Sequence, residues 1–353
     1  MNQSTAAPSS APLEVAKIPL SQRLPMDRLI LIVALLSVFA FFWYRVPGGR
    51  FGAAGNLETI ARQTAIVGTA ALGMTVIIAA GGIDLSVGSA VALTTVIIAF
   101  VLRRFQVGLA SGDGGDEALP SYAPYLAAMA GILAGTLCGF VNGLLTTGLR
   151  IVPFIVTLGT LLLFRGVATG TANEQKIDAP MTWLADVLSA LPPQKQWMLV
   201  SPGVWMLLIL AVAVAFLLYY TRFGLHVFAV GSNEATARLC GIRVSRVQLL
   251  VYTIGGFMAG VAGLLQFSRL TVGDPTVAVG LELDVIAAVV IGGGSLAGGQ
   301  GSVLGTLVGA LFMTTIRSGC SQMGLANWVQ QIVTGSIIVI AVTFDRLRHR
   351  RSN

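Results

Sequence analysis

The sequence predicts an all-α membrane protein: a polytopic bundle of about ten transmembrane or half-spanning helices, with broken helices at glycine-rich segments. Hydrophobic residues make up 55% of the 353 residues and charged residues only 10%, and the mean hydropathy is +0.82. An ordinary soluble domain does not reach these values. Apolar runs of membrane-spanning length recur along the chain, and two glycine-rich stretches interrupt them.

The N-terminal residues 1–28 are rich in serine, alanine and proline and lack hydrophobic periodicity, which predicts a disordered cytoplasmic tail. The first apolar run, 29–44, is either a signal peptide or a retained span. It starts late, is long for a signal peptide, and continues into Arg45 and Pro47 without a small-residue cleavage pattern. We therefore favour a first membrane span.

The membrane domain is expected over residues 29–345, with a basic cytoplasmic tail at 346–353. The densest arginine clusters lie at 238–246 and in this tail, and they fall on one side of the membrane, so the positive-inside rule predicts that both termini are cytoplasmic. Two of the nine apolar runs that follow the first are too short to cross a bilayer. The nine are 64–80, 85–101, 125–145, 152–172, 204–220, 247–267, 283–291, 303–316 and 329–344.

The net charge is +7, and most of the arginines lie in short loops between apolar runs and at the C-terminus. This placement indicates that they orient the chain in a membrane and argues against nucleic-acid binding. The three cysteines show no metal or redox spacing, and the two histidines cannot form a metal cluster or a serine-histidine pair. We therefore expect no metal, no cofactor and no catalytic site. These residues are Cys138, Cys240, Cys320, His226 and His349.

The first break is Gly-Gly-Ile-Asp-Leu-Ser-Val-Gly-Ser at residues 81–89. Non-helical backbone at membrane depth must be buried in protein or line a watery cavity, because its N–H and C=O groups find no partner in lipid. Asp84 therefore marks a point where two helices meet and where a polar solute could pass. We expect its carboxylate to cap a helix that starts at Leu85.

A second break, 292–301, follows an apolar run that carries Asp284. Each half of the chain thus has an apolar run, a glycine-rich break and another apolar run, the weak symmetry of duplicated transporter halves. Glycines also recur at every fourth position within helices, which predicts close helix packing within the bundle. These glycines are Gly131, Gly135, Gly139, Gly143, Gly256, Gly260, Gly301, Gly305 and Gly309.

The external segment at 173–203 contains a stretch, 181–191, whose leucines and valine share one helical face. This pattern favours an amphipathic helix at the outer interface, with Trp183 and Trp197 at the depth of the lipid headgroups. A plain loop is the alternative.

The cytoplasmic segment 221–246 contains the signals of a short capped helix. Ser232 or Asn233 can cap it, Glu234 lies in its first turn and four residues before Arg238, and Gly241 ends it. Such a helix is either a docking element or simply a capped loop.

The chain lacks a phosphate-binding loop of the type Gly-x-x-x-x-Gly-Lys-Ser/Thr. Its three lysines, Lys17, Lys176 and Lys195, do not follow a glycine. The chain therefore cannot hydrolyse ATP by that route. Transport driven by a partner, transport by a self-sufficient secondary carrier, and a membrane enzyme remain, in that order of preference.

The stretch at 81–89 resembles the signature of the permease subunits of bacterial ribose-type ABC sugar importers. The similarity covers roughly residues 73–342, and its motifs occur in the family's order. Matching motifs lie at 152–160, 165–166, 222–224, 229–235, 280–288 and 292–301.

This resemblance implies a multi-pass protein of the bacterial inner membrane. It implies a second permease subunit, identical or related, a cytoplasmic ABC ATPase that binds the ATP, and an extracytoplasmic binding protein that delivers a monosaccharide. It also implies that the short helix enters a cleft of the ATPase through Ser232, Asn233, Glu234, Ala235, Arg238 and Gly241. Nucleoside and branched-chain amino-acid permeases are related, so these solutes are the alternative cargo.

A neutral polyol is handled by hydrogen bonds and by apolar faces. The candidates for the substrate path are therefore polar or aromatic side chains at break or mid-span positions: Asp84, Ser86, Asn142, Phe154, Thr157 and Asp284.

Overall fold

The computed structural model describes residues 24–110, 119–192 and 197–350. Within these ranges the chain is almost wholly helical, with one antiparallel pair of two-residue strands, β1 (Ile177–Asp178) and β2 (Val272–Gly273). The all-α class is confirmed. Among the described residues, seven helices are long and apolar enough to cross a membrane: α2 (Ala54–Ala79), α3 (Val87–Ala110), α4 (Ala123–Leu149), α5 (Pro153–Thr171), α6 (Pro202–Tyr220), α9 (Val244–Leu270) and α11 (Val303–Gln322).

Each of the ten apolar runs overlaps a helix, but the count of about ten spans is not reached by length and hydropathy. With 11 residues, α10 extends only about half way across a bilayer, and two further helices hold shorter apolar stretches. The remaining helices are α1 (Leu24–Arg45), α7 (Arg222–Ser232), α8 (Glu234–Leu239), α10 (Leu281–Ile291) and α12 (Asn327–Arg350).

Helical structure extends into both of the expected tails. Helix α1 already begins at Leu24, because Pro25 suits a first helical turn; the rest of the expected N-terminal tail lies outside the described residues. Helix α12 continues to Arg350, since neither glycine nor proline interrupts residues 341–350.

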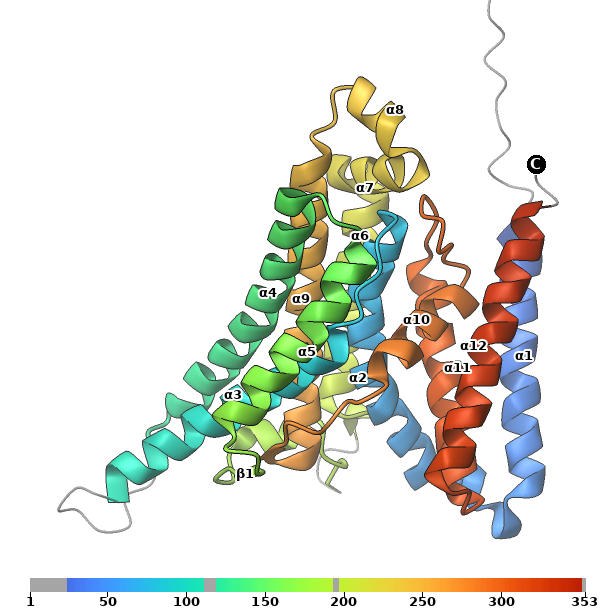
Figure 1. Cartoon of the computed structure of the whole chain (residues 1–353). Coiled ribbons are helices and arrows are strands. Elements are labelled where there is room, and N and C mark those ends of the chain that lie inside the picture. Colours follow the sequence, from blue (N-terminus) through green and yellow to red (C-terminus); the bar gives the residue numbers. More distant parts are fainter. Residues whose placement is uncertain (1–23, 111–118, 193–196, 351–353) are drawn as a thin grey trace, which may run out of the picture.

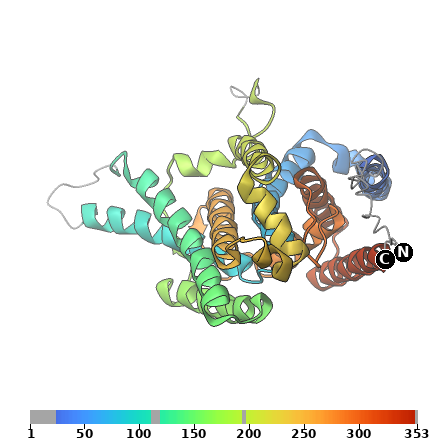
Figure 2. The same cartoon turned by 90° about the horizontal axis from the view of Figure 1, so that it is seen from above.

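Helices α2 and α9 form the centre of the bundle. In the span of α2, 83% of the residues are buried, and in that of α9 67%, whereas only 22% are buried in α5 at the rim. Figure 2 shows α3, α4 and α5 on one side of this centre and α1 and α12 on the other. The start of α1, the end of α12 and helix α8 lie at one end of the bundle, and β1 lies at the opposite end (Figure 1).

The glycine stripes pack helices of this chain against one another. A Cβ atom added to Gly135 would lie 2.5 Å from the Cα of Gly260, and one added to Gly256 would lie 2.6 Å from the Cα of Gly139. The backbones of α4 and α9 therefore touch, as the stripes predict. Gly309 on α11 faces the backbone of Ala288 on α10 in the same way.

Residues 181–191, all of them described, do not form the expected amphipathic helix. They contain a short 3₁₀ helix, η2 (Trp183–Val187), and the side chains of Leu184 and Leu188 are fully buried. The N–H of Leu188 donates to Ser268 Oγ at 2.8 Å. The leucines therefore pack into the end of the bundle instead of facing lipid, and this burial outweighs their helical spacing.

Candidate functional site

The first break contains a tight turn around Asp84. The side chain of Asp84 is only 2% exposed, and its Oδ1 accepts hydrogen bonds from the backbone N–H of Ser86 at 2.8 Å and from Ser86 Oγ at 2.7 Å. The expected cap of a helix from Leu85 is wrong, because α3 begins two residues later, at Val87. The carboxylate closes a local aspartate turn before the helix.

Helices α4 and α5 supply the rest of this polar cluster. Asn142 Nδ2 donates to Ser86 Oγ at 2.8 Å and lies 3.3 Å from both carboxylate oxygens of Asp84. Thr160 Oγ1 donates to Asn142 Oδ1 at 2.6 Å, and Thr157 Oγ1 donates to the carbonyl of Ile83 at 3.3 Å. The polar side chains thus satisfy one another and fix the broken backbone to two neighbouring helices.

The two breaks meet each other and helix α7. A Cβ atom added to Gly298 of the second break would lie 2.9 Å from the Cα of Gly81 in the first break and 2.5 Å from the carbonyl oxygen of Gly231 on α7. The N–H of Gly299 donates to the carbonyl of Ala79, at the end of α2, at 3.0 Å. Gly81 and Gly298 also have φ angles of 82° and 86°, a region that glycine adopts without strain.

Helix α8 projects from the end of the bundle, beyond α7 (Figure 1). Asn233 caps it by accepting the N–H of Thr236 at 2.9 Å, while Ser232 is the last residue of α7. Arg238 pairs with Glu234 at 2.7 Å, and Gly241 ends the helix with a φ of 83°. The geometry of a short, capped and exposed helix is therefore confirmed.

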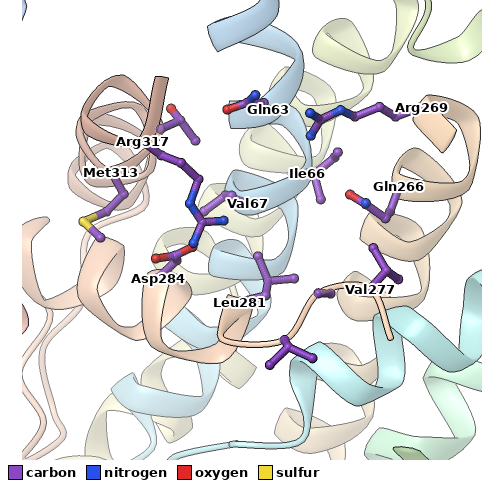
Figure 3. A pocket seen from close by; sticks show the side chains of 13 residues that line it. Gln63, Ile66, Val67, Gln266, Arg269, Val277, Leu281, Asp284, Met313 and Arg317 are labelled. Atoms are coloured by element: carbon purple, nitrogen blue, oxygen red, sulfur yellow. The ribbon is translucent and has the colours of Figure 1, made fainter. Parts of the chain in front are cut away.

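A pocket of about 300 Å³ lies among α2, α9, α10 and α11 (Figure 3). Asp284, which is 3% exposed, lines it and pairs with Arg317 Nη2 at 2.6 Å. The other lining side chains are mixed polar, basic and apolar: Gln63, Ile66, Val67, Gln266, Arg269, Val277, Ala278, Val279, Leu281, Met313 and Thr314.

A second pocket, of about 570 Å³, shares Gln63 and Arg317 with the first. Polar side chains dominate its wall, and Arg50 is its other charged residue. The remaining lining residues are Gly55, Asn56, Thr59, Ser318, Ser321, Gln322, Asn327 and Gln330. The two pockets together are called the basin below.

The loop between α9 and α10 forms one wall of the first pocket and is fixed from two sides. Arg165 Nη1 on α5 donates to the carbonyls of Pro275 and Val277, both at 2.7 Å. Lys176 pairs with Asp274 at 3.1 Å. Burial raises the pKa of the Asp274 carboxyl, but hydrogen bonds from Thr276 and Lys176 outweigh it, so this pKa lies below its ordinary value.

The structure separates the six candidates for the substrate path. Asp84, Ser86, Asn142 and Thr157 lie together in the buried cluster, whereas Asp284 lines the basin. Phe154 is 47% exposed on α5 and does not line either pocket. Four amide or arginine side chains of the first pocket were not predicted from the sequence, because they stand at or near the ends of apolar runs, where they look like loop residues. These are Gln63, Gln266, Arg269 and Arg317.

A helical bundle with two glycine-rich breaks at its centre, and with buried polar groups around one of them, has the architecture of a membrane transporter. The profile of the family described as "Branched-chain amino acid transport system / permease component" matches residues 56–342. The chain therefore belongs to this family of transport permeases.

Its relatives include several sugar permeases. The ribose import permease protein RbsC of Escherichia coli K12 is 35% identical over 89% of this chain and 92% of its own length. The L-arabinose ABC transporter permease protein AraH of Azospirillum brasilense is 31% identical over 92% of this chain and 89% of its own length. The xylose transport system permease protein XylH of E. coli K12 is 32% identical, with 92% of each covered. No solved structure matches the chain. The resemblance to ribose-type permeases is thus confirmed.

Proposed function

We propose that this chain is the transmembrane permease subunit of a bacterial ABC importer and forms the translocation path for a monosaccharide. Relatives named for ribose, L-arabinose and xylose import each align with about nine tenths of the chain, which supports a sugar over a nucleoside or a branched-chain amino acid. The ATP is bound by a separate ATPase, and this chain needs no cofactor of its own.

The coupling of the ATPase to the translocation path is inferred from one contact: Gly231 of α7 packs directly against the end of α2 and against the second break. Helix α8 follows α7 after a single residue, Asn233. A partner that moves α8 therefore moves α7, and through Gly231 it moves both breaks. We assign the contact with the ATPase to Ser232, Asn233, Glu234, Ala235, Arg238 and Gly241.

The arrangement of the ends supports an orientation. The start of α1, the end of α12 and helix α8 lie at the same end of the bundle, so an ATPase at α8 makes both termini cytoplasmic. The binding protein then delivers the sugar at the end that carries β1 and the basin. A second permease subunit, identical or related, completes the membrane part in the inner membrane.

The buried cluster acts as a support of the path in this mechanism. Asp84, Ser86, Asn142 and Thr157 make their hydrogen bonds to one another and to the break, so they keep the broken backbone in shape at membrane depth. Asp284, in the basin, contributes to the external opening of the path.

Reconstitution into liposomes tests the proposal. The chain alone should neither hydrolyse ATP nor take up sugar, and it should gain ATP-dependent monosaccharide uptake once its ATPase and binding protein are present. Concentrative uptake by the chain alone, driven by a proton or sodium gradient, would show a secondary transporter and refute the proposal.

A further inference from the structure

The basin lies at the end of the bundle away from α8. Gln63 belongs to the first half of α2, whose last residues adjoin α7. Gln266 and Arg269 lie near the end of α9, a helix that starts beside α8. Arg317 is in the second half of α11. In the proposed orientation this end is external, so the basin is accessible to a solute before it crosses the membrane.

The charges in the basin are unbalanced. Asp284 is the single carboxylate that lines either pocket in the described part of the chain, and Arg317 already pairs with it. Arg50 and Arg269 also line the basin, and neither guanidinium group has a hydrogen bond or ion pair within the described residues. Figure 3 shows the side chain of Arg269 extending from α9 toward Gln63. An anion would complete this surface.

The basin also holds unused hydrogen-bond acceptors. The Oε1 atoms of Gln63 and Gln322 are buried and have no partner within the described residues. A buried amide oxygen without a donor is costly, and a hydroxyl group supplies the missing donor. Ile66, Val67 and Met313 provide an apolar wall beside these polar groups, the mixture that suits a small ligand with hydroxyl and C–H faces.

We propose that the basin binds a monosaccharide that carries a carboxylate, such as a hexuronate, before translocation. This inference rests on the proposed function and narrows its substrate class. The carboxylate accepts the N–H groups of Arg269, whose planar fork suits two parallel hydrogen bonds. The hydroxyl groups donate to Gln63 and Gln322. A volume of about 300 Å³ for the first pocket alone is at the lower end of small-molecule sites.

The test compares two sugars that differ only at one carbon: D-galacturonate, with a carboxylate, and D-galactose, with a hydroxymethyl group. Their binding to the full chain in zwitterionic nanodiscs is measured calorimetrically at constant ionic strength. We expect galacturonate to bind at least about tenfold more tightly, because a charge-assisted hydrogen bond replaces a neutral one. Arg269→Gln should remove this preference, so that galacturonate binds no more tightly than galactose.

The matched control is Arg103→Gln, which removes one positive charge from an exposed position on α3 outside both pockets. It should leave the preference for galacturonate intact. Equal binding of the two sugars to the natural chain would refute the acid site. An equal loss of the preference for galacturonate in Arg269→Gln and Arg103→Gln would refute it as well. Acetate that competes as well as galacturonate would show a site for any anion and would also overturn the proposal.

A lipid phosphate could satisfy the same arginines. Adding phosphatidylglycerol to the nanodiscs distinguishes a lipid phosphate from a sugar carboxylate. If the site binds the sugar acid, the affinity for galacturonate should change less than twofold on this addition. A loss of galacturonate binding that returns when phosphatidylglycerol is omitted would assign the basin to a lipid headgroup and refute the sugar-acid site.

The inference and the proposed function fail through different measurements. ATP-dependent uptake of galactose by the assembled transporter, without galacturonate binding to the chain, would overturn the inference and leave the function in place. Galacturonate binding to the chain, without ATP-dependent uptake of either sugar by the assembled transporter, would support the basin and refute the proposed function.

Discussion

At the scale of single residues, Asp84 has two separable properties: it accepts hydrogen bonds, and it carries an acidic group. Its Oδ1 accepts the N–H and the hydroxyl of Ser86, and asparagine keeps that oxygen. Asn142 faces both carboxylate oxygens, so the new amide meets a donor there. Asn142 can turn its amide around, because its remaining partners are the hydroxyls of Ser86 and Thr160, which can each donate or accept.

We therefore expect Asp84→Asn to lower uptake only mildly. Asp84→Ala should reduce uptake severely, because it leaves buried donors without an acceptor at a cost of about 1–3 kcal/mol. Uptake is measured together with the amount of each variant in the membrane fraction. Complete loss of uptake in Asp84→Asn, at normal membrane abundance, would instead show that the acidic group itself is required and would revive a proton-coupled carrier.

At the scale of elements, the contact between α7 and the two breaks depends on the absence of a side chain at Gly231. An added Cβ would overlap the carbonyl oxygen of Ala79 and lie 2.6 Å from the N–H of Gly299. Both are backbone atoms and cannot move aside as a flexible side chain does.

Gly231→Ala should therefore destabilise the chain by about 1–3 kcal/mol, the range of an overpacked core, and lower the ATP hydrolysis stimulated by sugar and binding protein. Thermal unfolding in detergent and ATPase assays of the assembled transporter measure the two effects. Gly335→Ala is the control, since a Cβ there meets open space on α12. Equal melting temperatures and equal stimulation in both variants would contradict the assigned contact.

The exposed Glu234–Arg238 ion pair on α8 allows docking to the ATPase to be tested without disturbing the fold. An exposed ion pair between residues four apart contributes only about 0.2–0.5 kcal/mol to a helix, and both side chains of the Glu234–Arg238 pair are about half exposed or more. The double variant Glu234→Ala and Arg238→Ala should keep its melting temperature but lose copurification with the ATPase. Wild-type copurification and uptake in this variant would refute a coupling role for the pair.

At the scale of the whole molecule, orientation decides which partner reaches which end. The orientation can be tested by thiol labelling of the natural chain, because Cys240 beside α8 is exposed, whereas Cys138 and Cys320 are buried. A membrane-impermeant maleimide should label Cys240 in inside-out vesicles but not in spheroplasts. Labelling from the outer side alone would invert the proposed topology.

Asp178→Cys in a Cys240→Ser background provides the opposite control, since Asp178 is exposed on β1 at the other end. It should react in spheroplasts alone. Addition of the ATPase to inside-out vesicles should then slow the labelling of Cys240 in the natural chain, because the residue directly follows α8.

The sequence by itself determined the features that depend on neighbours along the chain. The apolar runs defined the helices, because a segment in lipid must satisfy its own backbone. The sequence predicted a cap at Ser232 or Asn233 and a stop at Gly241, because capping groups lie within three residues of their partners. The glycine stripes predicted close packing because a four-residue spacing places them on one helix face.

Only the tertiary structure decided which distant segments meet. Leu184 and Leu188 had the spacing of an interfacial helix, but a place in the core was available to them. Gln63 and Arg317 lie at the ends of apolar runs far apart in the sequence, yet they line the same pocket. Gly81, Gly231 and Gly298 come together from three separate segments. Local sequence patterns do not predict these contacts, because the residues are far apart in the sequence and meet only when the helices pack against one another.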